Sequence, residues 1–199
     1  MGNDKNANDA ASEPDSPNFG DIIYSDWISA AGSTIEVSVN SKIWPETRIA
    51  VLQEAALSIF DDVLSEFGNT KTSVNLCLCG DTQMQILNQK YRQIDKPTNV
   101  LSFPAYDPTE HRIDWGVHGS LGDIIIAGET MAREADDMQI PVSDHLIHLF
   151  VHGLLHLFGF DHIDDKSAKV MESLEVRLLS SIGVTNPYQD IYIGVRNSC

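Results

Sequence analysis

No apolar run in this 199-residue sequence approaches the roughly 20 residues that a helix needs to cross a membrane. Residues 1–21 also lack the apolar core of a secretory signal peptide, so we expect a cytoplasmic protein that contacts no membrane. Cysteine is scarce, with 3 residues. Cys77 and Cys79 lie on one predicted strand with no second pair to complete a metal site, so we expect them to be reduced core residues.

Positive charge is also scarce. The chain has 13 Lys and Arg against 29 Asp and Glu, which gives a formal net charge of −16. Such a surface repels phosphate and argues against a protein that binds nucleic acid by nonspecific charge. Part of the acidic excess lies in residues 1–20, which are polar, poor in large apolar residues and predicted to form a disordered acidic tail. Any contact with nucleic acid would need a local basic patch or a partner.

The rest of the chain has the composition of a globular protein. Hydrophobic residues make up 42% of the sequence, so we expect residues 21–199 to form one domain with a single core. Apolar patterns predict strands at 34–39, 73–79, 100–103 and 121–126. Helical periodicity predicts helices from Pro45 to Gly68, through Met84, Leu87 and Tyr91, and over 129–138, 143–158 and 165–182. This order predicts an α+β fold with one small mixed sheet packed against helices.

One short stretch, HGLLHLFGFDH, holds His152, His156 and His162 near the end of a helix in the C-terminal half. His152 and His156 are four positions apart, so they share a helix face about 6 Å apart along the axis. Gly159 is able to take a left-handed conformation that ends the helix and lets His162 return toward the other two. Three imidazoles with one open position are typical of catalytic zinc, where bound water becomes a nucleophile. We predict one Zn²⁺ per chain.

Other interpretations of these histidines remain open. Imidazole also suits nickel, copper and iron, and the three residues could be ordinary histidines at a helix end. The zincin-like spacing H-x3-H-x2-G-x2-H is that of metzincin peptidases, which carry a glutamate general base directly after the first histidine. Gly153 occupies that position here, so a peptidase would lack its proton acceptor. Metallopeptidase therefore remains an alternative that this residue disfavours.

Three blocks of the sequence resemble one known family. HGLLHLFGFDH is similar to the motif HGxLHLxGxDH of the bacterial rRNA maturation endoribonuclease family, YbeY. Residues 87–103, LNQKYRQIDKPTNVLSF, resemble that family's LNxxYRxxDxxTDVLSF, and residues 121–124, LGDI, match its LGDI strand. The end of the chain, from Leu178 to Tyr188, is similar but far less specific. The resemblance covers roughly residues 33–190 and leaves the tail outside it.

The resemblance implies a zinc-dependent single-strand endoribonuclease that acts in ribosomal RNA maturation, including small-subunit rRNA 3′ end processing, and in ribosome quality control. Its partners would be single-stranded ribosomal RNA and the ribosome, with ribosomal proteins and assembly factors. His152, His156 and His162 match the family's metal ligands, and Arg92 matches its functional arginine. Asn99 departs from the pattern, because the family usually has Asp there. An amide replaces the hydrogen bonds of that carboxylate but not its charge.

Arg92 suits phosphodiester cleavage physically, because a guanidinium holds two phosphate oxygens and offsets the charge that grows at phosphorus. With Lys90 and Lys96 it forms the densest basic window of an acidic chain. The alternative is a surface arginine on a solvated loop. Because Gly153 replaces the peptidase glutamate, the general base stays unassigned, and a histidine, a substrate oxygen or metal hydroxide could serve.

Several other polar residues are candidates with an ordinary structural alternative. His148, and His145 before it, share a helix face with the predicted ligands, so His148 could bond a ligand or simply be a helix histidine. Asp161 could orient a ligand or cap the turn, and Asp123 could reach the site or bond the chain locally. The polar loop 104–119 could form a lid or a base-stacking platform, or be variable surface, and its candidates are His111, Asp114, Trp115 and His118.

A function of a different class also fits the composition. The protein could be a ribosome-assembly binding factor whose metal site is structural or weakly active. An acidic surface would favour docking on basic ribosomal proteins by charge complementarity. Cleavage of a defined rRNA precursor distinguishes the two functions.

Overall fold

The structure, a computed structural model, describes residues 21–40, 42–67, 71–106 and 119–188. The acidic tail predicted for residues 1–20 lies outside these ranges. So do the loop candidates His111, Asp114, Trp115 and His118. Among the described residues, no helix combines the length and apolar character that crossing a bilayer requires.

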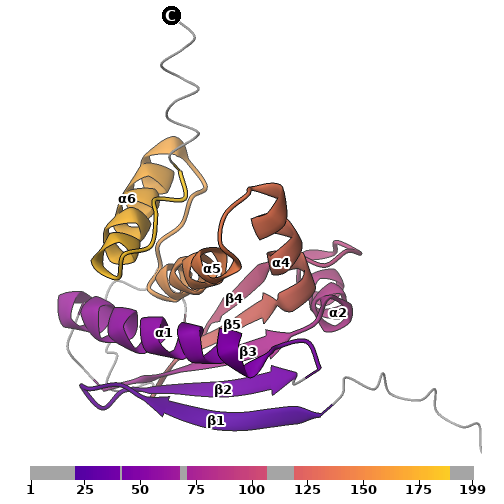
Figure 1. Ribbon diagram of the computed structural model, residues 1–199. Coiled ribbons are helices and arrows are strands. Elements are labelled where there is room, and N and C mark those ends of the chain that lie inside the picture. The colour runs from indigo at the N-terminus through magenta and orange to yellow at the C-terminus, as the bar shows by residue number, and fades with distance from the viewer. Residues whose placement is uncertain (1–20, 41, 68–70, 107–118, 189–199) are drawn as a thin grey trace, which may run out of the picture.

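One mixed sheet of five strands forms the centre of the fold, in the order β1-β2-β3-β5-β4 (Figure 1). Its strands β2 and β3, and β3 and β5, pair in parallel, whereas the outer pairs β1–β2 and β4–β5 are antiparallel. The strands are β1 (Ile22–Ile28), β2 (Thr34–Asn40), β3 (Ser73–Cys79), β4 (Val100–Pro104) and β5 (Ser120–Ala127). The predicted α+β class with one small mixed sheet is confirmed.

Strand β1 is the element that the sequence did not predict. Six of its seven residues are exposed and only Trp27 is buried, so it shows no alternation of buried and exposed positions. It lies at the sheet edge and pairs only with β2 among the described strands. Edge strands bury little on either face, and their apolar pattern is correspondingly weak.

The helices cover the sheet on two sides. Helices α1 and α5 lie over one face, where Val74, Leu76 and Leu78 of β3 point into the main core (Figure 1). On the other face Met84 of α2 packs with Leu101 in a smaller cluster. The helices are α1 (Glu46–Phe67), α2 (Asp81–Arg92), α4 (Gly128–Asp137), α5 (Val142–Leu157) and α6 (Asp165–Ser181), all close to their predicted positions.

Cys77 and Cys79 lie on the face covered by α2. Both are free thiols, Cys79 buried and Cys77 half-buried. No disulfide joins them, which agrees with the prediction of reduced cysteines that belong to the core.

Helix α5 approaches the sheet very closely at Gly153. A Cβ at this position would lie 2.9 Å from the Cγ2 of Ile124 and 3.0 Å from the Oγ of Ser102. Glycine therefore allows α5 to pack directly on β5 and β4. As a result, His152 and His156 of this helix lie near β4 and line a cavity together with its residues. The close packing also leaves no room for the glutamate side chain that a metzincin would need here.

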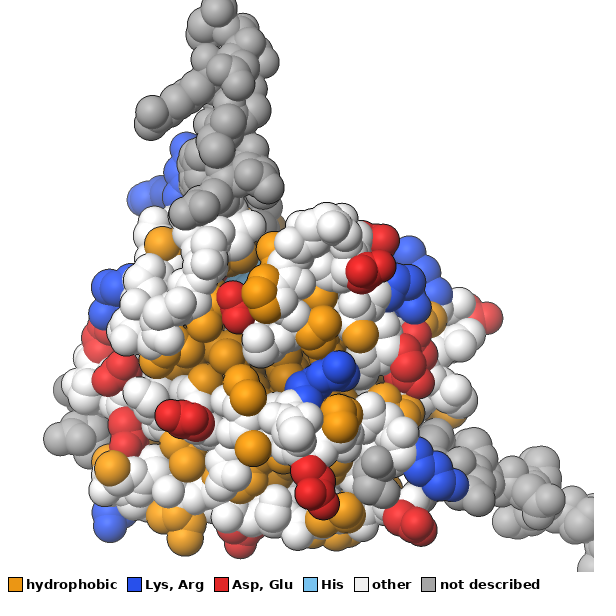
Figure 2. Space-filling view, viewed as in Figure 1, with side chains coloured by type: hydrophobic (Ala, Val, Ile, Leu, Met, Phe, Trp, Pro, Cys, Tyr) orange, Lys and Arg blue, Asp and Glu red, His pale blue; other side chains and the backbone are white. Residues whose placement is uncertain are grey.

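The side of the molecule that Figure 2 shows carries an apolar hollow. Figure 2 shows apolar side chains gathered between α1 and the helices above it, and the cavity there has a volume of about 400 Å³. Lys and Arg residues on this face are scattered among acidic ones (Figure 2). The described residues of this side therefore offer no concentrated positive charge.

Candidate metal centre

The chain turns back directly after α5, as its glycine predicts. Gly159 has φ +83°, and the N–H of Phe160 donates to the carbonyl of Leu155 over 3.1 Å. The reversal brings His162 back to α5, with its ring centre 5.3 Å from that of His152 and 5.1 Å from that of His156. One nitrogen from each ring lies within 4.8 Å of the other two. The structure thus brings together the three residues that the sequence singles out.

Hydrogen bonds decide which ring nitrogen carries the proton in each of the two helix histidines. His156 Nδ1 lies 2.9 Å from the carbonyl oxygen of Phe160, which only accepts, so Nδ1 carries the proton. His152 Nδ1 lies 2.7 Å from the Oε1 of Glu175, a carboxylate that likewise accepts. In the neutral rings the two Nε2 atoms are then both unprotonated, and they face each other at 3.1 Å.

Two facing lone pairs at this distance repel each other unless a cation lies between them. A tetrahedral zinc ion with nitrogen ligands at about 2.0–2.1 Å spaces those nitrogens by about 3.3 Å. The donor set therefore fits a metal ion in chemistry and in spacing. Burial and the nearby His152 lower the pKa of His156, which keeps this imidazole neutral and able to ligate near pH 7.

Glu175 of α6 is the charged group behind this site. It is fully buried, at 0% exposure. Burial alone would raise the pKa of its carboxyl, but hydrogen bonds from His148, His152 and Tyr188 lower that pKa to about 2. Glu175 is therefore ionised at neutral pH and accepts a hydrogen bond from the Nδ1–H of His152.

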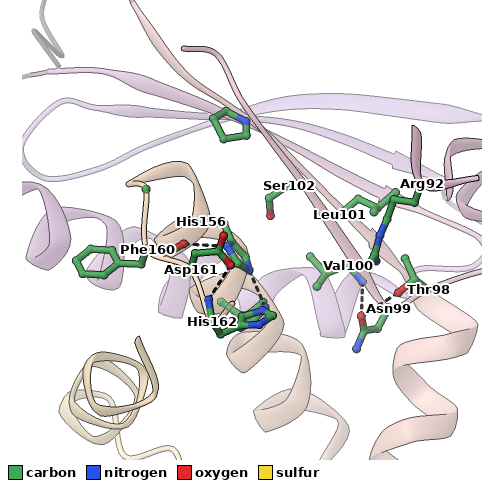
Figure 3. Close-up of a pocket in the computed structure, with 13 residues that line it drawn as sticks. Arg92, Thr98, Asn99, Val100, Leu101, Ser102, His156, Phe160, Asp161 and His162 are labelled. Carbon is green, nitrogen blue, oxygen red and sulfur yellow. Dashed lines mark hydrogen bonds between the residues drawn. The ribbon is translucent and has the colours of Figure 1, made fainter. Parts of the chain in front are cut away.

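The histidines form one wall of a cavity of about 520 Å³. Figure 3 shows Arg92, Thr98 and Asn99 across this cavity from His156 and His162. Arg92 is the last residue of α2, and its side chain is exposed and makes no ion pair with any described residue. The Arg92 guanidinium, which has no ion pair among the described residues, and three imidazoles that could hold a metal ion therefore share one cavity.

Asn99 has a partner that explains why an amide serves here. Its Nδ2 donates to Glu134 Oε2 over 2.9 Å, and its Oδ1 accepts from the N–H of Val100 over 2.7 Å. An aspartate in the same conformation would place a second carboxylate against Glu134. Asn99, which departs from the family pattern, thus donates a hydrogen bond to Glu134 that an aspartate could not donate.

The remaining candidates have local partners. Asp161 lines the cavity, but its Oδ1 accepts from the N–H of His162 over 2.7 Å, so it stabilises the turn. Asp123 points to the other side of the sheet, where its Oδ1 accepts from Asn75 over 2.6 Å, and it does not line the cavity. His145 pairs with Glu134, and His148 lies 3.4 Å from Glu175 Oε2.

Sequence reasoning missed Glu175 and Tyr188, although a signal for Glu175 exists. In α6 it lies among the apolar residues that face the core, Met171, Leu174, Leu178 and Leu179. A charged residue on the apolar stripe of a helix is rarely buried without a partner, so this position calls for one.

Comparison with known proteins gives concordant results. A family model described as endoribonuclease YbeY matches residues 37–183. A protein named endoribonuclease YbeY from Bradyrhizobium sp. is 46% identical over 79% of this chain and 93% of its own length. One of the same name from Allorhizobium ampelinum is 41% identical over 77% and 93%. The solution structure of a Thermotoga maritima protein is similar with a TM-score of 0.47 and 21% identity, covering 66% of this chain and 83% of that one.

Proposed function

The chain belongs to the endoribonuclease YbeY family, and from this premise we propose that it is a zinc-dependent single-strand endoribonuclease. Its substrate is ribosomal RNA during maturation, including the 3′ end of the small-subunit rRNA, and it contributes to ribosome quality control in the cytoplasm. The observation that carries the proposal is that three convergent imidazoles share one cavity with Arg92, which forms no ion pair with any described residue.

His152, His156 and His162 are the residues that hold the metal in this proposal. Zinc is our choice because neutral imidazoles are ligands that it favours, and one ion per chain fits one set of three. When bound there, zinc supplies Lewis acidity toward a water or a phosphoryl oxygen. Two of the ligands are oriented in advance, since Glu175 and the carbonyl of Phe160 fix their protonated nitrogens.

In this proposal, Arg92 binds the scissile phosphate. Its guanidinium offers paired donors to two phosphate oxygens, and it stabilises the charge that develops in the transition state. Because described acidic residues form no ion pair with it, this charge is available to the substrate. A phosphodiester positioned between Arg92 and the histidines is held at both sides, which favours a single strand whose backbone reaches the cavity.

The net charge of −16 bears on how RNA arrives. An acidic protein gains little from long-range attraction to RNA, so delivery by the ribosome, its proteins or assembly factors is part of the proposal. The same charge also favours the second candidate, a ribosome-assembly binding factor with a structural or weakly active metal site.

The test is cleavage of a defined rRNA precursor by purified protein. Wild type is compared with His156→Ala and Arg92→Glu, and with Arg48→Glu, a charge reversal on α1 outside the cavity. We expect cleavage by wild type and Arg48→Glu only, and loss of wild-type cleavage with a chelator. If both cavity variants cut like wild type, the activity is a contaminant and the binding factor is favoured. Chelator-sensitive cleavage of casein would instead favour a peptidase.

A further inference from the structure

Helix α6 contributes none of the three convergent imidazoles, yet its one fully buried charged side chain, Glu175, is directed at the candidate metal centre. Glu175 lies on the apolar face of α6, and its side chain is 1% exposed. A buried carboxylate is costly unless its oxygens are occupied by donors. Its donors among the described residues come from two other segments, α5 and the residues after α6.

The two carboxylate oxygens have separate partners. Oε1 accepts from His152 Nδ1 over 2.7 Å. Oε2 accepts from the hydroxyl of Tyr188 and lies 3.4 Å from His148 Nε2. Tyr188 and His148 therefore hold one oxygen in place, and within the described part of the chain the other oxygen has His152 as its hydrogen-bond donor.

This arrangement acts on the nitrogen that the metal needs. An isolated neutral histidine exchanges its proton between Nδ1 and Nε2, and the Nε2–H form cannot ligate through Nε2. A fixed carboxylate at Nδ1 selects the tautomer with a free Nε2, fixes the ring plane and increases the basicity of that nitrogen. Nε2 of His152 faces the Nε2 of His156, as a shared ion requires.

We propose that Glu175 is a positioning residue that holds His152 in its metal-binding tautomer, and that Tyr188 and His148 hold Glu175 for this task. The zinc part of this inference rests on the function proposed above. It also connects the segment after α6 with the metal centre, since the Tyr188 hydroxyl donates to the carboxylate that holds His152.

Helix α5, which carries His152, also offers a matched control. His145 Nε2 lies 2.9 Å from Glu134 Oε2, so it too is paired with a carboxylate, but neither residue belongs to the set of convergent imidazoles. Glu134→Gln perturbs a histidine–carboxylate pair in the same way as Glu175→Gln while leaving the candidate ligands untouched. Any effect of simply weakening such a pair appears in both variants.

The experiment uses the full chain and two readouts. The first is zinc affinity, measured by competition with a chromophoric chelator for wild type, Glu175→Gln, Tyr188→Phe and Glu134→Gln. We expect Glu175→Gln to bind zinc about 10- to 100-fold more weakly, Tyr188→Phe to lose about 10-fold or less, and Glu134→Gln to match wild type. The second readout is the nitrogen NMR spectrum of the His152 ring in metal-free protein, where Nδ1 should carry the proton in wild type and share it with Nε2 in Glu175→Gln.

Each outcome decides the proposal. If Glu175→Gln lowers the melting temperature as Glu134→Gln does while zinc affinity and the His152 tautomer stay at wild-type values, Glu175 only packs α6 against α5 and the inference is wrong. If wild type binds no zinc, the proposed function fails. The NMR comparison of the metal-free proteins then still tests the tautomer by itself. Should Glu175→Gln fail to fold, Tyr188→Phe removes one donor and supports both readouts.

Discussion

Helix α5 carries two histidine–carboxylate pairs about two turns apart, and they lead to different sites. His145 is paired with Glu134 over 2.9 Å and His152 with Glu175 over 2.7 Å. The second nitrogen of His145, Nδ1, is buried and has no hydrogen-bond partner among the described residues. The second nitrogen of His152 faces another imidazole nitrogen at the edge of a cavity. The carboxylate therefore does not identify a metal ligand, whereas the surroundings of the second nitrogen do.

Replacing each histidine of the two pairs gives the largest expected difference. His152→Ala removes one of three candidate ligands, so we expect zinc in the purified protein to fall from about one per chain to background, and RNA cleavage with it. His145→Gln keeps a side-chain donor toward Glu134 and should retain its zinc. Metal analysis of both proteins, purified without added metal, measures the contrast. Equal zinc contents in the two variants would contradict the assignment of His152.

A variant of Arg92 distinguishes two functions of the site around His152, which are metal binding and chemistry on the substrate. Arg92→Glu should lower kcat/KM for an rRNA precursor by about 10²- to 10³-fold, the range seen when a group that stabilises transition-state charge is removed. Zinc affinity should stay at the wild-type value, because no candidate ligand is changed. Steady-state kinetics with metal analysis on the same preparation tests both statements. A loss of zinc in this variant would show that Arg92 supports the metal centre instead of the phosphate.

The sequence predicted those parts of the site that depend on local geometry. His152, His156 and His162 lie on one helix and one glycine turn, so spacing alone indicated that they converge. Asp123 shows the limit of such reasoning, because strand alternation directs it to the opposite face, where it bonds Asn75. Glu175 was missed since its contact with His152 joins two helices. The chemistry of Arg92 left a functional role and a surface role open, and the family resemblance favoured the functional one. Strand β1 was missed because six of its seven residues are exposed.

Asn99→Asp perturbs the pair of His145 and Glu134, because it places a second negative charge beside Glu134. The lost donor and the new repulsion should destabilise the protein by about 1–3 kcal/mol at pH 7. The deficit should shrink as the pH falls, because protonation of either carboxyl relieves the repulsion between them. Urea denaturation at pH 7 and pH 5 measures the change, and a deficit that grows on acidification would contradict this explanation of the asparagine.

Glu134→Gln gives the smallest effect, and its pH dependence shows what the His145 pair contributes. Burial alone would raise the pKa of Glu134, but hydrogen bonds from His145 and Asn99 lower it below its ordinary value. A carboxyl with a lowered pKa in the folded state stabilises the protein at pH values above its unfolded pKa, and this contribution is lost as the pH falls through the folded value.

Because the Glu134 side chain is 32% exposed, we expect Glu134→Gln to lose only about 1 kcal/mol of stability at pH 7. In thermal melts, wild type and variant should converge in acid, below the lowered pKa of Glu134, and the two proteins should bind zinc equally at pH 7. A difference that persisted in acid would mean that Glu134 acts through its shape and not through its charge, and the two pairs on α5 would then differ in chemistry as well as in surroundings.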